Sequence, residues 1–304
     1  MHMKKILYIL AVCSILSCNN DRTKSNKLNV VTTTSMLTDL VQNIGGDSIV
    51  VNGLMGAGVD PHLYKASEGD VSKLYNADII FYNGLHLEGK LVEVFEQMDS
   101  SNKTQVALAE VLDKNELIGS DYFASNYDPH VWFDIDYFKQ FAEKTATVLA
   151  QEDPTNAAFF QKNKMAYLAE LERLETEVKT TIASLPKEKR ILVTAHDAFN
   201  YFGKAYDFEV VGLQGLSTAT EAGVQDVQRL SDFIIDKKVK AIFVESSVPR
   251  RTIEALQAAV LSKGAEVIIG GSLYSDALGN AGSVEGTYTG MFRYNVNTIV
   301  NSLK

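Results

Sequence analysis

Short apolar runs alternate along the chain with longer segments that have helical spacing. Eight runs rich in β-branched and aromatic residues predict strands, because polar residues, glycine or proline bound them. The predicted strands are residues 30–33, 49–55, 79–82, 106–108, 191–194, 210–213, 241–244 and 267–269. Apolar residues recur every three or four positions between them, which predicts helices. This alternation predicts an α/β fold with two lobes, each with a four-stranded parallel sheet flanked by helices.

The longest helical pattern lies between the two halves. Residues 155–185 contain no glycine or proline, and they follow Asp153 and Pro154, a natural N-cap and a first helical residue. About 30 residues at 1.5 Å each span about 45–50 Å, so one rigid helix is expected to touch both lobes. A helical hairpin broken near residues 162–164 is the alternative. The predicted division is an N-terminal lobe at 28–150, a linker helix at 151–186 and a C-terminal lobe at 187–304.

The first residues have the pattern of an export signal. Lys4 and Lys5 precede eleven apolar or small residues at 6–16, too few for a bilayer span of about 20. Residues 15–18 (Ile-Leu-Ser-Cys) resemble a bacterial lipobox, which implies a signal peptide at 1–17, lipidation of Cys18 and a tether at 18–27. An ordinary secretory signal is the alternative. Either places the protein outside the cytoplasm, and a lipid at Cys18 would anchor it at the outer face of the cytoplasmic membrane or in a periplasm.

Composition narrows the chemistry. The 304 residues are 46% hydrophobic and carry a net charge of −9, so a nucleic-acid partner, which needs a basic surface, is not expected. Both cysteines, Cys13 and Cys18, lie in the export segment. The exported domain therefore has no thiolate for a metal and no disulfide.

Two of the five histidines occur in the same tripeptide, Asp-Pro-His, at residues 60–62 and 128–130. Proline fixes its own φ and extends the residue before it, so each turn presents its histidine stiffly. His196 and Asp276 follow predicted strands, where ligands bind in open α/β sheets. Singly, each histidine is more often a core or capping residue, and Asp276 could equally be an N-cap. Together, His62, His130, His196 and Asp276 would complete a shell for a divalent ion.

Other polar residues have weaker signals. Carboxylates often orient metal-binding imidazoles, and four acidic residues are candidates for this role: Asp134, Asp197, Glu221 and Glu245. Each could equally be a helix cap or a surface charge. His86 precedes a predicted helix and is left out of the site.

Seven sequence motifs carry a family resemblance. They lie at residues 30–33, 53–55 with 58–64, 77–85, 128–134, 193–202, 243–247 and 274–279. In combination they resemble the metal-binding, solute-binding lipoproteins of ABC transporters, of the TroA, PsaA and ZnuA type and most closely TroA. The resemblance implies two lobes joined by a rigid helix, ligands at His62, His130, His196 and Asp276, and no enzymatic activity.

The resemblance also implies a cargo and partners. A monomer would deliver a divalent metal to a membrane permease and its ATPase. Manganese-dedicated members often have glutamate at the position of His196, and zinc-dedicated members a histidine-rich loop between the first two ligands. This chain has neither, so zinc and manganese stay open, with iron behind them.

Two other functions are compatible with parts of the sequence. A zinc-dependent hydrolase would use Glu245 as general base, but four protein ligands leave no open position for water. A surface adhesin is compatible with an anchor, but it gives a buried polar ligand set no purpose.

Overall fold

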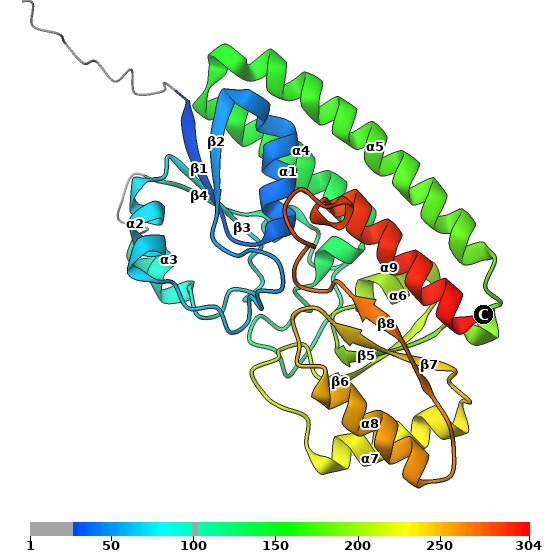
Figure 1. The fold of residues 1–304 in the computed structure, drawn as a ribbon. Coiled ribbons are helices and arrows are strands. Elements are labelled where there is room, and N and C mark those ends of the chain that lie inside the picture. The colour runs from blue at the N-terminus through cyan, green and yellow to red at the C-terminus, as the bar shows by residue number, and fades with distance from the viewer. Residues whose placement is uncertain (1–26, 99–102) are drawn as a thin grey trace, which may run out of the picture.

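The computed structural model describes residues 27–98 and 103–304; the predicted signal peptide and Cys18 lie outside these ranges. Two parallel four-stranded sheets form its framework, in the orders β2-β1-β3-β4 and β6-β5-β7-β8 (Figure 1). The strands are β1 (Leu28–Thr32), β2 (Ile49–Gly53), β3 (Ile79–Tyr82), β4 (Thr104–Ala107), β5 (Ile191–His196), β6 (Glu209–Gln214), β7 (Ala241–Glu245) and β8 (Ile268–Leu273). The predicted fold class is confirmed.

Helices cover both faces of each sheet. The helices of the described residues are α1 (Ser35–Gly45), α2 (Glu68–Asn76), α3 (Val92–Met98), α4 (Ile135–Glu152), α5 (Ala157–Ala183), α6 (Asn200–Tyr206), α7 (Val224–Asp236), α8 (Arg251–Ser262) and α9 (Tyr288–Leu303). Successive strand residues point to opposite faces. Val30 of β1 therefore packs in the cluster that holds α1 and α4, and Val31 in the cluster that holds α2 and α3.

The long helix α5 is continuous over Ala157–Ala183, which excludes the helical hairpin. Its 27 residues span about 40 Å. Asp153 caps the preceding 3-10 turn by accepting a hydrogen bond from the Asn156 amide. Figure 1 shows α5 running past both sheets, with α9 beside it. None of the described helices has the length and apolar composition that crossing a bilayer requires.

The two lobes share apolar packing on the α5 side. One cluster runs from Val30 and Phe81 of the first sheet through α4 and α5 to Phe202 of α6 and Phe292 of α9. Lobes move freely when the interface between them is small or polar. This interface is apolar and continuous, so the α5 side is expected to be rigid.

The apolar spacing of residues 87–98 predicts a helix over that whole range, but α3 begins only at Val92. Leu85 and His86 have φ values of 50° and 63°, in the left-handed region that a helix cannot include. The buried Glu88 carboxylate holds this turn by accepting from the backbone amides of Asn83 and Gly84, at 2.8 and 3.2 Å. Apolar spacing alone did not reveal the turn.

Asp39 joins α1 to α9, and its titration predicts a pH dependence of stability. Its carboxylate accepts from the Tyr288 amide at 3.0 Å and the Asn43 side chain at 3.1 Å. Burial raises the pKa of Asp39 to about 6. The folded state therefore holds a proton that the unfolded chain loses near pH 4, so stability contributed by this group falls as pH rises from about 4 to 6.

Asp39→Asn keeps an acceptor and removes the charge. We expect the variant to match the wild type near pH 4 and to exceed its unfolding free energy by about 2–3 kcal/mol at pH 7, from about 1.4 kcal/mol per pKa unit. Urea unfolding at pH 4, 5, 6 and 7 measures the difference. A difference that stays constant across this range would refute the assignment.

Candidate metal centre

Four polar side chains from both lobes meet between the sheets. His62, His130, His196 and Asp276 each offer one ligand atom, and these atoms all lie within 4.8 Å of one another. All four residues are buried, with at most 5% of their surface exposed. His62 follows β2, His130 precedes α4, His196 ends β5 and Asp276 follows β8. The structure thus brings together the four residues selected from the sequence.

The two Asp-Pro-His turns share one local structure. Asp60 Oδ1 accepts the His62 backbone N–H at 2.8 Å, and Asp128 Oδ1 accepts the His130 backbone N–H at 2.9 Å. An aspartate that bonds the amide two residues later forms a compact turn, and the proline between them restricts it further. Each turn therefore holds its histidine backbone in a defined direction.

Asp128 also fixes the His130 ring. Its Oδ1 lies 2.7 Å from His130 Nδ1, and both side chains are fully buried. A carboxylate at Nδ1 places the ring proton there and leaves Nε2 as a free lone pair. Sequence reasoning did not select Asp128 for this role, although it is the first residue of the tripeptide.

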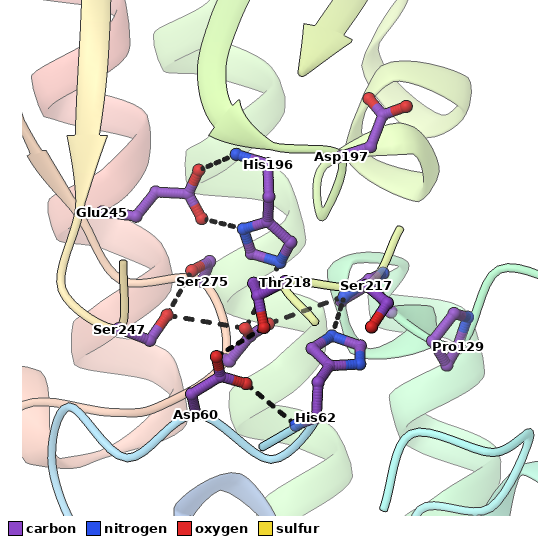
Figure 2. A network of polar contacts seen from close by, with 12 residues as sticks. Asp60, His62, Pro129, His196, Asp197, Ser217, Thr218, Glu245, Ser247 and Ser275 are labelled. Carbon is purple, nitrogen blue, oxygen red and sulfur yellow. Dashed lines mark hydrogen bonds and ion pairs between the residues drawn. The ribbon is translucent and has the colours of Figure 1, made fainter. Parts of the chain in front are cut away.

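Glu245 holds His196 through the backbone amide and lies at ion-pair distance from the ring. Its Oε2 lies 2.6 Å from His196 Nδ1, and its Oε1 accepts the His196 backbone N–H at 2.8 Å. Figure 2 shows both contacts reaching His196 from the end of the neighbouring strand β7. Glu245 was one of the four candidate carboxylates.

The distances inside the cluster suit one small cation. Nε2 of His62 lies 3.2 Å from Nε2 of His130, which lies 3.6 Å from Asp276 Oδ1. Nε2 of His196 lies 3.3 Å from Asp276 Oδ2. Tetrahedral ligands about 2.0–2.1 Å from a zinc ion would be about 3.3 Å apart. Neither His196 Nε2 nor Asp276 Oδ1 makes a well-formed hydrogen bond within the described residues.

The electrostatics also favour a cation. Burial lowers the pKa of His62 to about 3, so this ring is neutral at physiological pH. Burial alone would lower the pKa of His196, but the carboxylates of Glu245 and Asp276 outweigh it and raise that pKa well above its usual value. Burial would raise the pKa of Asp276, but the imidazoles of His196 and His130 hold it below its usual range. Without metal, a proton on His196 offsets buried negative charge that a divalent ion would neutralise.

The remaining candidates bond elsewhere. Asp134 caps α4 by accepting from the amides of residues 136 and 137. Asp197 accepts from the Gly212 amide at 3.0 Å, and Figure 2 shows its carboxylate directed away from the His196 ring. Glu221 is exposed and pairs with Arg251 at 3.3 Å. Exposed His86 contacts the Phe123 ring, with centroids 6.2 Å apart.

Comparison with known proteins gives consistent matches. The family model ZnuA, described as the periplasmic component A of a zinc-uptake complex, matches residues 30–302. The manganese-binding lipoprotein MntA of Bacillus subtilis (strain 168) is 45% identical over 299 residues, 97% of each chain. The zinc-binding protein TroA of Treponema pallidum (strain Nichols) is 46% identical over 285 residues, 94% of this chain and 92% of that protein. The solved structure of periplasmic TroA from Treponema pallidum matches with a TM-score of 0.89, covering 91% of this chain and 99% of the other.

Proposed function

Because the chain belongs to the ZnuA family, we propose that it captures a divalent transition metal between its lobes for import by an ABC transporter. It is a substrate-binding component and not an enzyme. Glu245, the general base that a hydrolase would use, is buried, accepts the His196 backbone N–H and lies at ion-pair distance from the His196 ring. The metal is the transported substrate.

The convergence of the four ligand atoms carries the proposal. We assign one coordination bond each to His62, His130, His196 and Asp276. Asp128 and Glu245 support this assignment, because they hold the rings of His130 and His196 with Nε2 facing Asp276. Four protein donors fill a tetrahedral shell and leave no position for a catalytic water, as storage or transport of an ion requires.

The donor set favours zinc. Affinity at a given nitrogen and oxygen site rises from manganese through iron towards the later metals, and zinc lies well above both. MntA is named for manganese and TroA for zinc, and both are nearly equally identical to this chain. Sequence similarity therefore does not decide between the two metals. We propose zinc as the ion bound most tightly, followed by iron and then manganese.

Metal analysis tests the function. Protein purified from its own host is expected to contain about one transition-metal ion per chain, and competitive titration is expected to show zinc displacing manganese. A metal content near zero together with no uptake of either ion would overturn the proposal.

His196→Glu is expected to shift selectivity towards manganese. An oxygen donor suits manganese better than an imidazole does. The change is best made with Glu245→Gln, because the glutamine still accepts the residue 196 amide and does not repel the new carboxylate. We expect the ratio of zinc to manganese affinity to fall at least about tenfold relative to Glu245→Gln alone. Competition titrations measure both affinities; an unchanged ratio would show that residue 196 does not bind the ion.

We propose the following location and assembly. Residues 1–17 are a signal peptide, Cys18 carries a lipid and residues 18–27 tether a monomer to the membrane outside the cytoplasm, where it meets the permease and its ATPase. The proposed lipid anchor is supported by the similarity to MntA, which is described as a lipoprotein. Lobes at 28–150 and 187–304 with a linker at 151–186 remain the proposed division.

Cys18→Ala is expected to move the protein from the membrane to the soluble fraction; unchanged membrane association would contradict lipidation.

A further inference from the structure

The two Asp-Pro-His turns are held by the C-terminal lobe with unequal strength. In each turn the aspartate uses one oxygen for the histidine amide, as described above, and the other for a side chain of the C-terminal lobe. The difference between the turns lies in how many further contacts support this second bond.

Several contacts support the bond that ties the His130 turn to the C-terminal lobe. Asp128 Oδ2 accepts from Asn200 Nδ2 at 3.0 Å, and the Asp128 carbonyl accepts from the Tyr201 hydroxyl at 3.1 Å. The Pro129 carbonyl accepts from the Asn83 side chain at 3.0 Å. Asp128 is fully buried, so these bonds are shielded from water. His130 is therefore fixed by both lobes.

The His62 turn has one such bond among the described residues. Asp60 Oδ2 accepts from Thr218 Oγ1 at 2.5 Å, while Asp60 Oδ1 accepts the His62 amide (Figure 2). Asp60 itself is only partly buried. The hold on His62 from the C-terminal lobe therefore depends on one hydroxyl.

Thr218 lies in the loop between β6 and α7, residues 215–223. It is 8% exposed, whereas Ala219, Thr220 and Glu221 after it are exposed. The ends of the loop are tied through Gly215, Glu221 and Gly223. Its middle, residues 216–220, is lightly held: Gln214 Nε2 donates to the Thr220 carbonyl at 3.2 Å, and the Ser217 hydroxyl accepts from the Ala219 amide at 3.2 Å. A buried hydroxyl in an exposed, lightly bonded loop is suited to make and break a single contact.

The loop that carries Asp276 is tied more firmly. Trp132 Nε1 donates to the Ser275 carbonyl at 3.1 Å, and the Leu278 amide donates to Ser35 Oγ at 2.8 Å. Both bonds also cross between lobes. Of the proposed ligands, His62 is thus the one whose departure breaks the fewest contacts.

We propose that Thr218 is a positioning residue that controls metal release: its hydroxyl holds Asp60, and through it the His62 turn, closed over the ion. Loss of this bond frees the Asp60 carboxylate to turn towards solvent and loosens the His62 backbone. The ion then leaves on the side of the 215–223 loop, without movement of the rigid α5 side. This inference rests on the proposed function, since it requires a bound metal.

Thr218→Val tests it, because valine keeps the shape and lacks the hydroxyl. We expect zinc dissociation to accelerate about tenfold, the fold-change typical of losing one hydrogen bond to a charged group. Thr218→Ser restores a hydroxyl and should release zinc at nearly the wild-type rate. Ser217→Ala is the matched control, because the hydrogen bond that Ser217 makes among the described residues stays within the loop, and its rate should not change. Stopped-flow release into excess chelator gives the rates, and thermal unfolding of the metal-free variants should show one cooperative transition for each.

The effect must pass through Asp60. In an Asp60→Ala background, Thr218→Val is expected to change the rate less than twofold. An unchanged rate in Thr218→Val, a serine variant as fast as the valine variant, or a full tenfold effect without Asp60 would each overturn the inference. Failure of the wild-type protein to bind zinc would instead overturn the proposed function, so the two failures are distinguishable.

Discussion

Replacing His130 with alanine is expected to weaken zinc binding by about 10²–10³-fold. Four-ligand zinc sites have apparent binding free energies of about 10–16 kcal/mol, so an equal share per ligand is about 2.5–4 kcal/mol. The loss of zinc affinity should lie near the upper end of this range. Asp128 would keep its bond to the residue 130 amide but lose the ring contact at 2.7 Å, which leaves a fully buried carboxylate short of a partner.

Tryptophan fluorescence offers a direct measurement. Trp132 is the only tryptophan, its ring centroid lies 5.3 Å from that of His130, and its Nε1 bonds the residue before Asp276. Zinc titrations against a competing chelator should therefore report on the site itself. His86→Ala is the matched control, because His86 is exposed and outside the four-residue cluster. Equal affinities in the two alanine variants would exclude His130 as a ligand.

The candidate site could be read from the sequence because its signals are local. A proline next to a histidine stiffens the turn whatever surrounds it, and a polar residue directly after a strand lies at the sheet edge where ligands bind. These two rules selected the four side chains that the structure brings within 4.8 Å. Their role as ligands remains a prediction for the variants above.

The carboxylates that contact the histidine rings, Asp128 and Glu245, could not be identified from the sequence in the same way. Asp134 and Asp197 lie four residues and one residue from a histidine of the cluster, and Asp128 lies two residues away. Asp134 and Asp197 nevertheless accept bonds from other backbone amides. Glu245 reaches His196 only because β7 is the neighbour of β5 in the order β6-β5-β7-β8. Strand order depends on tertiary packing, and one-dimensional spacing does not specify it. The turn at Leu85 and His86 was missed for a related reason, since a buried Glu88 fixes it through contacts across the loop.

The rigid α5 side and the weakly held His62 turn have complementary consequences. Apolar packing along α5 and α9 keeps the C-terminal ligands facing the N-terminal ones whether or not metal is present. The three imidazoles therefore stay close to the buried carboxylates of Asp128, Glu245 and Asp276. Such an arrangement stores unfavourable electrostatic energy that a divalent ion relieves, so binding should stabilise the whole fold.

Zinc is accordingly expected to raise the unfolding free energy by about 4 kcal/mol or more. A ligand that binds only the folded state contributes RT ln(1 + [L]/Kd), about 4 kcal/mol at a thousandfold excess over Kd. A free zinc concentration of about 10 μM meets this condition for a Kd of about 10 nM, a value within the range of four-ligand sites. For a chain of this size, 4 kcal/mol corresponds to a rise in midpoint of about 6–7 °C.

Thermal unfolding in chelator, zinc and manganese measures this effect. We expect the zinc midpoint to be highest, the manganese midpoint intermediate because the nitrogen-rich donor set binds manganese more weakly, and excess chelator to restore the metal-free value. His130→Ala should lose most of the zinc shift while its metal-free midpoint changes less. If zinc raised the midpoint of His130→Ala as much as that of the wild type, the stabilising ion would be bound elsewhere, because only ions held by the buried cluster depend on this ring.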